Sequence, residues 1–512
     1  MPLSVLVETM SEDNSYRQIL RSTSIIGGSS VINIVIGLLR MKAVAMLLGP
    51  AGVGLIGLLS NVITLASNVA GLGFGNAGTR QIAEAAGEND PQRIATARRA
   101  LFWGTLVLAV LGALLLWLLR DVLATHVLGD ATLAHRIGWL SLGVALTVAA
   151  ASQNALLNGL RRIGDIARMR IASALLSTVL GLLALWWWRE EGIVVFVMTA
   201  PLATFLFGHL YVARLPKVWV PTSNLRELSL QWCTLVSLGG AFMVAGLAGT
   251  AGQLLVRTLV QHKLGMQALG QFEAAWMISM TYIAFVLGAM GTDFYPRLTS
   301  IIRDHEAVNR LVNEQTEVAL LLTAPVILAM LALTPWVIHL LYTAEFAEAA
   351  MVLRWQVLGD FLKIASWPLG FILLADGAGR TYMITEWIGI GSFVLFTWVG
   401  LPFFGITATG IAFLGLYAVY LPLVYCLAMR RTQFSWQKQI QWQLIIVLGL
   451  AAITAGIAKY SEVAAALTGM TFAVATSLYG LIKLGDMVNP EGQLGRLVSL
   501  SRKVFKRIGF KR

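Results

Sequence analysis

Two apolar stretches of the chain each carry a series of polar residues that ends in an arginine. The two series are Ser30, Asn33, Gly37 and Arg40, and Gly246, Thr250, Gln253 and Arg257. Their spacing of three or four residues places each series on one face of a helix. Arginine presents a planar fork of N–H donors that matches a diphosphate better than a neutral sugar. We therefore expect the two stripes to line a polar, positively charged cavity that binds such an anion.

Further charged residues stand inside or at the ends of other apolar stretches. Asp360 and Lys363 are three residues apart and can pair on one helix face. A neutralised structural pair is the simpler interpretation, and a gating or ligand-facing role is the alternative. Glu273 and Glu386 have no evident partner in their own helices, so each is a candidate for binding and releasing a proton or cation.

The remaining residues show no arrangement typical of an enzyme or a metal site. Cys233 and Cys426 form no CxxC motif and have no Cys/His ligand spacing. The glycine-rich segment 71–75 lacks the Gly-Lys-Ser/Thr that completes a phosphate-binding loop. We therefore expect no catalytic residues, no metal and no cofactor.

Fourteen apolar stretches, each about as long as a bilayer is thick, must position these residues. The chain is 57% hydrophobic and only 12% charged, with mean hydropathy +0.75, whereas a soluble domain carries about 25% charged residues. The predicted spans are 22–47, 51–78, 100–119, 137–160, 171–188, 192–213, 232–256, 272–296, 317–341, 352–375, 382–399, 405–428, 441–458 and 463–482. The sequence therefore predicts an all-α polytopic membrane protein.

The basic residues predict its orientation. With the N-terminus inside, 28 of the 38 Lys and Arg fall on the cytoplasmic side, six fall outside and four lie within spans. This asymmetry is typical of the positive-inside rule and places both termini in the cytoplasm. The net charge of +12 is spread over short loops and a basic tail, so we expect contact with membrane lipids and not with nucleic acid. Segments 87–100 and 303–317 are expected to form short amphipathic helices on the cytoplasmic surface.

The position of the basic residues within the predicted spans gives a second interpretation of the two stripe arginines and of nearby Lys42. Lys42, Arg40 and Arg257 lie within about two turns of the predicted outer helix ends. Long basic side chains there can extend their charges to the membrane surface without binding a ligand. This interpretation is favoured for Lys42, while the matched polar stripes favour the cavity for the two arginines.

The chain also repeats itself with an offset of about 216 residues. A pattern L-G-x-x-[AG]-[VL]-G, which predicts a tight outside turn between two helices, follows the first span at 48–54 and the seventh span at 264–270. At an offset of 217, Arg40, Arg80 and Arg93 match Arg257, Arg297 and Arg310. Six spans per repeat give two parallel lobes, because an even number of crossings preserves direction. We expect a cytoplasmic N-terminus (1–21), a first lobe (22–214), a linker (215–231), a second lobe (232–428), two extra helices (441–482) and a basic tail (483–512).

Several short motifs resemble those of the multidrug/oligosaccharidyl-lipid/polysaccharide (MOP) exporter superfamily, and within it the Wzx-like polysaccharide flippases. They are Gly27-Gly28 through Arg40, the glycine pattern at 48–54, Asn158-Gly159-Leu160-Arg161-Arg162, Leu264-Gly265 through Phe272, and 340–346. The match covers roughly residues 18–430. It implies a V-shaped two-lobe bundle with a cationic central cavity, a general pattern that Arg40, Lys42 and Arg257 fit.

The resemblance implies a transporter and not an enzyme. Its expected substrate is an undecaprenyl-diphosphate-linked oligosaccharide, an O-antigen or related surface-polysaccharide unit, moved across the bacterial inner membrane by alternating access. A polysaccharide polymerase and a chain-length regulator are candidate partners. A multidrug extruder of the same fold is an alternative, although its cavity should be acidic. A polysaccharide polymerase or ligase is another, although the outside loops are too short for a catalytic domain.

Overall fold

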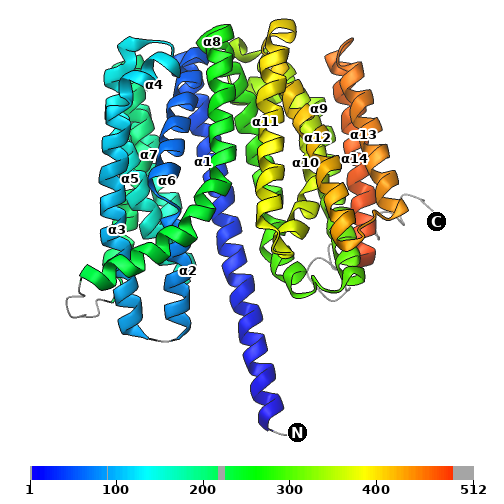
Figure 1. The fold of residues 1–512 in the computed structure, drawn as a ribbon. Helices are drawn as coiled ribbons and strands as arrows, with labels where there is room; N and C mark the ends of the chain where they lie inside the picture. The colour runs from blue at the N-terminus through cyan, green and yellow to red at the C-terminus, as the bar shows by residue number, and fades with distance from the viewer. Residues whose placement is uncertain (1–2, 89, 217–224, 488–512) are drawn as a thin grey trace. The chain divides into compact units, whose positions relative to one another are not determined.

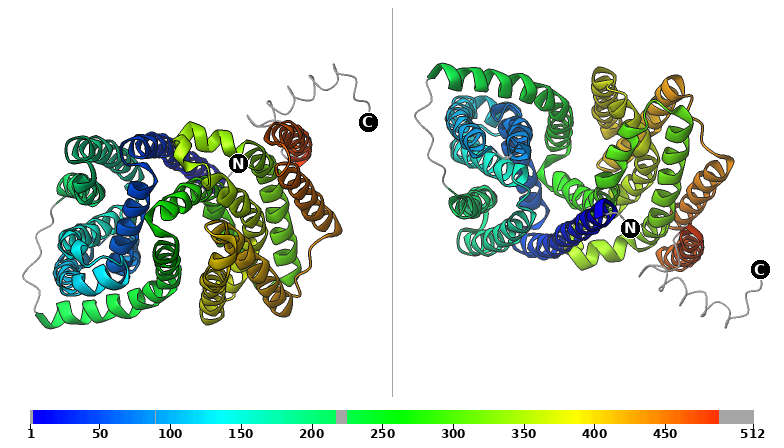
Figure 2. Two further views of the ribbon diagram at one scale, coloured as in Figure 1. Left: turned by 90° about the horizontal axis from the view of Figure 1, so that it is seen from above. Right: turned by 90° about the horizontal axis from the view of Figure 1, so that it is seen from below.

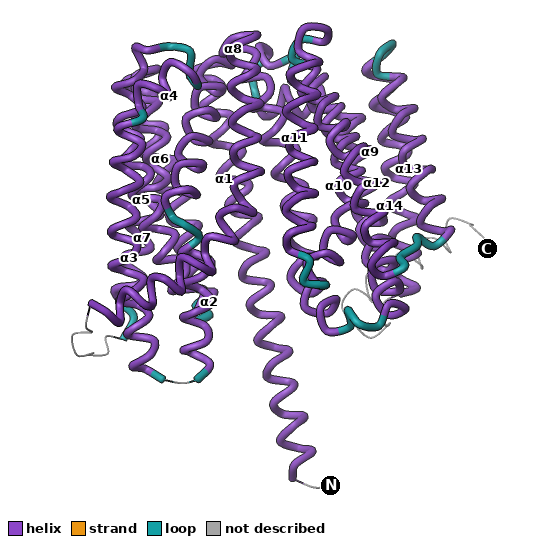
Figure 3. The backbone as a smooth tube through the Cα atoms, in the orientation of Figure 1, coloured by secondary structure: helices purple, strands orange, loops and turns teal. Residues whose placement is uncertain are grey.

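The computed structural model describes residues 3–88, 90–216 and 225–487, and these form helices joined by short loops with no strand among them (Figure 3). They fall into two compact units. Unit 1 is Met1–Gly270 with Leu341–Thr343, and unit 2 is Gln271–Leu340 with Ala344–Arg512. The prediction of an all-α fold is confirmed.

The apolar stretches of the structure match the predicted spans. Ten stretches of the described residues are long and apolar enough to cross a membrane; Ile163–Ala213 contains two predicted spans, and Gly27–Ala70 covers most of two others. The two remaining predicted spans, 232–256 and 272–296, both lie in the 76-residue helix α8 (Leu225–Ser300). The chain is therefore a multi-pass membrane protein, as expected.

Unit 1 is a helical bundle made of α1 to α7 and the first part of α8. Its other elements are α1 (Leu3–Ala70), α2 (Phe74–Gly87), α3 (Pro91–Leu118), α4 (Arg120–His126), η1 (Ala131–Leu133), α5 (Ala134–Gly159), α6 (Ile163–Trp188), η2 (Arg189–Gly192) and α7 (Ile193–Ala213). α5 packs against both α3 and α7, and α6 packs against α7 and α1 (Figures 1 and 2). The first part of α8 runs obliquely past one end of this bundle before it turns to follow the other helices (Figure 1).

The first part of α8 is attached to unit 1 by close contacts. The indole Nε1 of Trp232 donates to the carbonyl oxygen of Ala100 at 2.9 Å. Gly239 lies against the turn between α1 and α2, where a Cβ on Gly73 would be 2.6 Å from the Cα of Gly239. The division between units consequently falls after Gly270, whereas the repeat divides the chain at 215–231. The repeat-based lobes remain a prediction.

Both copies of the glycine pattern bend a helix in the same way. Gly49 has φ 62° and ψ −166°, and Gly265 has φ 86° and ψ 178°. L-residues with a side chain rarely adopt a positive φ, so glycine suits both positions. The turns expected after the first and seventh spans are therefore sharp bends inside α1 and α8.

Three sequence-based boundaries need correction. The second predicted span, 51–78, is interrupted, because α1 ends at Ala70 and Leu72 and Gly73 both take positive φ before α2 begins. The surface helices expected at 87–100 and 303–317 are not separate elements but the first turns of α3 and α9. The parts of these segments that are helical, 91–100 and 305–317, contain no glycine that would end a helix. Each helix therefore continues into the apolar stretch that follows. Asp90 does start α3, since its Oδ1 accepts from the backbone N–H of Gln92 at 2.9 Å.

Unit 2 contains the end of α8 and the remaining helices. These are α9 (His305–Leu341), η3 (Ala344–Phe346), α10 (Ala349–Ala375), α11 (Gly379–Phe404), α12 (Thr407–Thr432), α13 (Lys438–Ile457) and α14 (Glu462–Met487). α12 packs against both α10 and α11, and α13 pairs with α14 (Figure 1). The described side chains of α10 are mostly buried, so α10 lies at the core of this unit.

Candidate functional site

Arg40 is held inside unit 1 by an aromatic ring. Its guanidinium carbon lies 4.2 Å from the ring centroid of Phe196 on α7, and this phenylalanine is 1% exposed. A cation over an aromatic face is stabilised by about 0.5–2 kcal/mol, depending on its hydration. The stacking covers one face of the half-buried guanidinium. Its in-plane N–H groups are the part that suits an anion.

Arg257 contacts Gln253, the residue that precedes it in the second stripe, one turn earlier on α8. One guanidinium nitrogen, Nη1, donates to the carbonyl oxygen of Gln253 at 3.2 Å and lies 3.5 Å from Oε1 of the same residue. Arg257 is only 5% exposed. Thr250 donates to the carbonyl oxygen of Gly246 at 3.2 Å, within its own helix. Asn33 and Lys42 are half-buried on α1.

The other charged candidates lie in unit 2, and the first of them is Asp360 on α10. Asp360 is fully buried, and its Oδ2 accepts hydrogen bonds from the Ser279 hydroxyl at 2.7 Å and the Tyr282 hydroxyl at 2.5 Å. Its Oδ1 has no hydrogen-bond partner among the described residues. Burying a charged carboxylate away from water destabilises the folded protein unless a nearby cation neutralises its charge.

Lys363 supplies the positive charge beside Asp360. It interacts electrostatically with both Asp360 and Glu386. Its Nζ lies 3.7 Å from the sulfur of Met280 and 5.8 Å from the ring centroid of Tyr417. No ion pair joins Asp360 and Lys363 among the described residues, so their direct pairing stays a prediction, and Glu386 from α11 is a second carboxylate that acts on Lys363.

Glu386 has one partner on its own helix, contrary to the expectation from the sequence, and one on α12. Its Oε1 accepts a hydrogen bond from the Tyr420 hydroxyl of α12 at 2.6 Å, and Tyr382 interacts with it from one turn earlier on α11. The group that we call the charged cluster thus comprises Asp360, Lys363 and Glu386 with Ser279, Tyr282, Tyr382, Tyr417 and Tyr420. It links α8, α10, α11 and α12.

Glu273 is buried on α8 at 3% exposure, and like Lys42 and Arg257 it is engaged by at least one other group. Sequence reasoning missed the tyrosines of the charged cluster. Tyr417 and Tyr420 share a helix face, and Tyr282 stands three residues after Ser279. Pairs of polar side chains at helical spacing in apolar helices could have indicated that these residues belong to a buried polar group.

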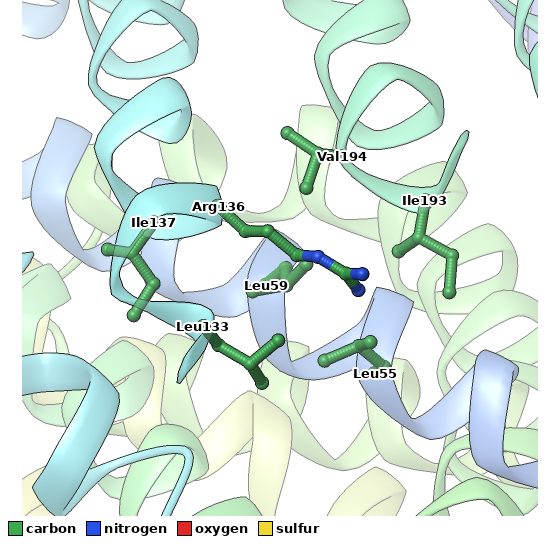
Figure 4. A pocket seen from close by; sticks show the side chains of 7 residues that line it. All are labelled: Leu55, Leu59, Leu133, Arg136, Ile137, Ile193 and Val194. Atoms are coloured by element: carbon green, nitrogen blue, oxygen red, sulfur yellow. The ribbon is translucent and has the colours of Figure 1, made fainter. Parts of the chain in front are cut away.

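One partly open hollow in unit 1 is too small for a substrate. It measures about 10 Å³ and lies among Leu55, Leu59, Leu133, Arg136, Ile137, Ile193 and Val194. The Arg136 side chain extends across it between these aliphatic groups (Figure 4). A space of this size accommodates at most one water molecule.

Comparison with known proteins gives the family. A model described as "Polysaccharide biosynthesis protein" matches residues 19–302, more than half of the chain. The chain belongs to this family. Proteins named "Lipid III flippase" from Escherichia coli (strain K12) and Shigella flexneri are each 24% identical over 420 residues, which is 79% of this chain and 97% of the relative.

Solved structures show that this family member has the fold of MOP superfamily transporters. An inward-facing MATE family multidrug resistance transporter matches with TM-score 0.68 and 16% identity, covering 79% of this chain and 98% of that chain. The lipid II flippase MurJ, in an inward closed conformation, matches with TM-score 0.68 and 10% identity over 91% and 99% of the two chains. The expected resemblance is confirmed. These named relatives are transporters and flippases, so the family member is a transporter and not an enzyme.

Proposed function

We propose that this protein moves an undecaprenyl-diphosphate-linked oligosaccharide from the inner to the outer leaflet of a bacterial inner membrane. The observation that carries the proposal is the match to lipid III flippases along nearly their whole length. Those relatives are named as flippases of a lipid, and the family to which this chain belongs is described by polysaccharide biosynthesis. An O-antigen or related surface-polysaccharide unit is the substrate, and both termini lie in the cytoplasm.

The substrate-binding role falls on the unit 1 stripes. Arg40 and Arg257 hold the diphosphate, and Asn33, Thr250 and Gln253 contact polar parts of the substrate, with Lys42 adding positive charge. Support comes from Arg40, which is stacked on Phe196, and from Arg257, which is 5% exposed. Both positions differ from a side chain extended freely to the membrane surface.

The multidrug alternative rests on the shared fold of the MATE transporter. Extrusion of organic cations calls for an acidic binding surface, whereas the stripes carry Arg40, Lys42 and Arg257. Polymerase or ligase chemistry is disfavoured because the longest predicted outside segment, 120–136, consists of α4, η1 and short turns.

Genetic complementation tests the proposal. The wild-type gene, expressed in a bacterium that lacks its own surface-polysaccharide flippase, should restore surface glycan. Membranes of the parent strain should accumulate lipid-linked repeat units on the cytoplasmic side. Restored resistance to a cationic drug with no change in glycan would contradict the proposal. A polysaccharide polymerase and a chain-length regulator would act on the translocated product and are the partners to seek by crosslinking.

We further propose that the charged cluster couples translocation to an ion gradient. Lys363 interacts electrostatically with both Asp360 and Glu386, so protonation of either carboxylate, or a cation beside Asp360, would change the balance between the two interactions. Asp360→Asn and Glu386→Gln should remove the gradient dependence of translocation while the protein still inserts. Glu273→Gln tests the other buried candidate. Glu190→Gln, which changes an exposed acidic residue of η2 outside the cluster, is the control. Gradient-driven translocation that survives in all three candidate variants would eliminate this role.

A further inference from the structure

α5 and α10 end with the same backbone turn, but an arginine stands in one turn and a glycine in the other. Arg161 has φ 52° and Gly377 has φ 71°, and they are 216 residues apart, like the bends at Gly49 and Gly265. In both turns the next residue donates its backbone N–H to a carbonyl oxygen five residues earlier, at 2.9 Å. This turn favours glycine, because a Cβ destabilises a positive φ. Arg161 therefore strains the backbone at a position where the second repeat has glycine.

α6 and α11 differ in the same way at their C-terminal ends. Arg189 has φ 49° and ψ −123°, and Gly405, again 216 residues later, has φ 53° and ψ −140°. A Cβ on Gly377 or Gly405 would meet nothing within 4 Å, so the backbone conformation and not a lack of space favours glycine there. Strained residues persist where the side chain has a function. The two arginines are consequently candidates for binding residues.

Arg161 and Arg189 stand at opposite ends of one membrane-spanning helix. α6, which lies between them, has 26 residues and is therefore about 39 Å long. This length is close to the roughly 40 Å that separates the two headgroup layers of a bilayer. Four apolar side chains of α6 are 40–55% exposed and available to lipid, namely Leu175, Val179, Leu180 and Leu183. The two arginines therefore lie at the two surfaces of the membrane.

Aromatic side chains mark the headgroup level at both ends of α6. The three tryptophans at 186–188 directly precede Arg189 and are 54–66% exposed. At the other end, Tyr211 of α7 and Leu160, the neighbour of Arg161, pack against the same group of buried side chains. Tryptophan and tyrosine are enriched at the level of lipid headgroups. Each strained arginine therefore stands where the phosphate groups of phospholipids lie.

Carboxylates also stand near both arginines. Asp165 follows Arg161 by four residues, and its oxygens lie 4.0 Å from Nη1 of Arg162 and 3.6 Å from Nη1 of Arg168. Glu190 and Glu191 follow Arg189 in η2 and are exposed. Ion pairs at an exposed surface stabilise a protein only slightly. These carboxylates consequently do not explain why arginine occupies a strained backbone at either end.

We propose that Arg161 and Arg189 bind the phosphate groups of phospholipids, one in each leaflet, at the two ends of α6. A guanidinium group can donate two parallel hydrogen bonds to the oxygens of one phosphate. Phosphate binding offsets the strain of the backbone, which glycine would relieve without supplying a donor. The proposal concerns the lipid around α6 and does not depend on which substrate is transported.

The melting temperature of the purified full-length protein, measured in detergent with and without added lipid, tests this proposal. The probes are phosphatidylglycerol and diacylglycerol, which lacks the phosphate. R161G and R189G should melt in detergent alone at the same temperature as the wild type or higher, because glycine relieves the positive φ. Each variant should nevertheless lose about half of the rise in melting temperature that phosphatidylglycerol causes. Diacylglycerol should affect all variants alike.

Three further variants separate charge, position and backbone strain. R161K keeps a cation at the strained position and should retain most of the phosphatidylglycerol effect. R170Q removes an exposed arginine from the regular part of α6 and should leave that effect nearly unchanged. Gly377→Ala adds a Cβ that has room but an unfavourable φ, so it should lower the melting temperature in detergent alone.

Four results would overturn the proposal. The first is a lower melting temperature of R161G and R189G in detergent alone, which would make the arginines structural. The second is an unchanged phosphatidylglycerol effect in both glycine variants, and the third is an equal loss in R170Q. The fourth is stabilisation by undecaprenyl phosphate but not by phosphatidylglycerol, which would assign the arginines to a carrier lipid.

Discussion

Gly54 and Gly270 meet backbone to backbone in unit 1. A Cβ on Gly54 would lie 2.8 Å from the backbone nitrogen of Gly270 and 2.7 Å from the carbonyl oxygen of Met266. The two glycines close the two copies of the L-G-x-x-[AG]-[VL]-G pattern. Equivalent parts of the repeat therefore pack on each other, and the absence of side chains allows the contact.

Alanine at these positions should destabilise the protein. Gly54→Ala and Gly270→Ala each force backbone apart, which costs about 1–3 kcal/mol. Gly249→Ala is the control, because a Cβ there meets nothing within 4 Å and alanine favours a helix. Thermal unfolding in detergent measures the difference. Equal melting temperatures for all three variants would show that the close approach is not required.

A partly buried ion pair should attach α14 to α10 within unit 2. Arg354 on α10 pairs with Glu462 in the first turn of α14, and the Arg354 side chain is 9% exposed against 46% for Glu462. Glu462→Gln leaves a buried guanidinium without its counter-charge and should cost about 1–3 kcal/mol, below the range for fully buried pairs because of the exposure. Arg354→Met should cost less, since the remaining carboxylate reaches water.

The double variant R354M/E462Q completes a thermodynamic cycle for this pair. It should be more stable than the sum of the two single losses predicts. Lys483→Gln is the control at the other end of α14, where the lysine lies 3.9 Å from Glu317 and is more exposed. Strictly additive losses at Arg354 and Glu462 would show that the pair contributes no coupling energy.

The predicted topology can be tested by cysteine labelling after Cys233 and Cys426 are replaced. Glu88→Cys lies between α2 and α3, and Ala131→Cys lies in the exposed segment between α4 and α5. The basic-residue asymmetry predicts that a membrane-impermeant maleimide labels position 131 in intact cells and position 88 only after lysis. The reverse labelling would invert the orientation.

The sequence predicts the local features well, because they depend on short-range chemistry. Gly49 and Gly265 could be recognised as bends from the repeated pattern, and Asp90 as a helix start from its place before a proline. Each of these features involves residues within one turn.

Contacts between distant segments could not be predicted in this way. Arg354 and Glu462 are 108 residues apart, and Arg40 meets Phe196 only because α1 packs near α7. The early end of α1 at Ala70 was missed because the apolar pattern continues through Leu72 and Phe74, while the backbone turns at Gly73. The hydrophobic pattern alone does not predict the turn at Gly73.

We propose that Arg40 and Arg257 help to carry a lipid-linked diphosphate across the membrane. Translocation of undecaprenyl-diphosphate-linked oligosaccharide in proteoliposomes, followed by access of a glycan-modifying enzyme from one side, tests this role. Arg40→Glu and Arg257→Glu should each lower the rate by about tenfold or more, since a carboxylate repels the diphosphate. Arg→Lys should keep part of the rate, because the charge remains although the fork is lost. Wild-type rates in both glutamate variants, with equal protein inserted, would contradict the account.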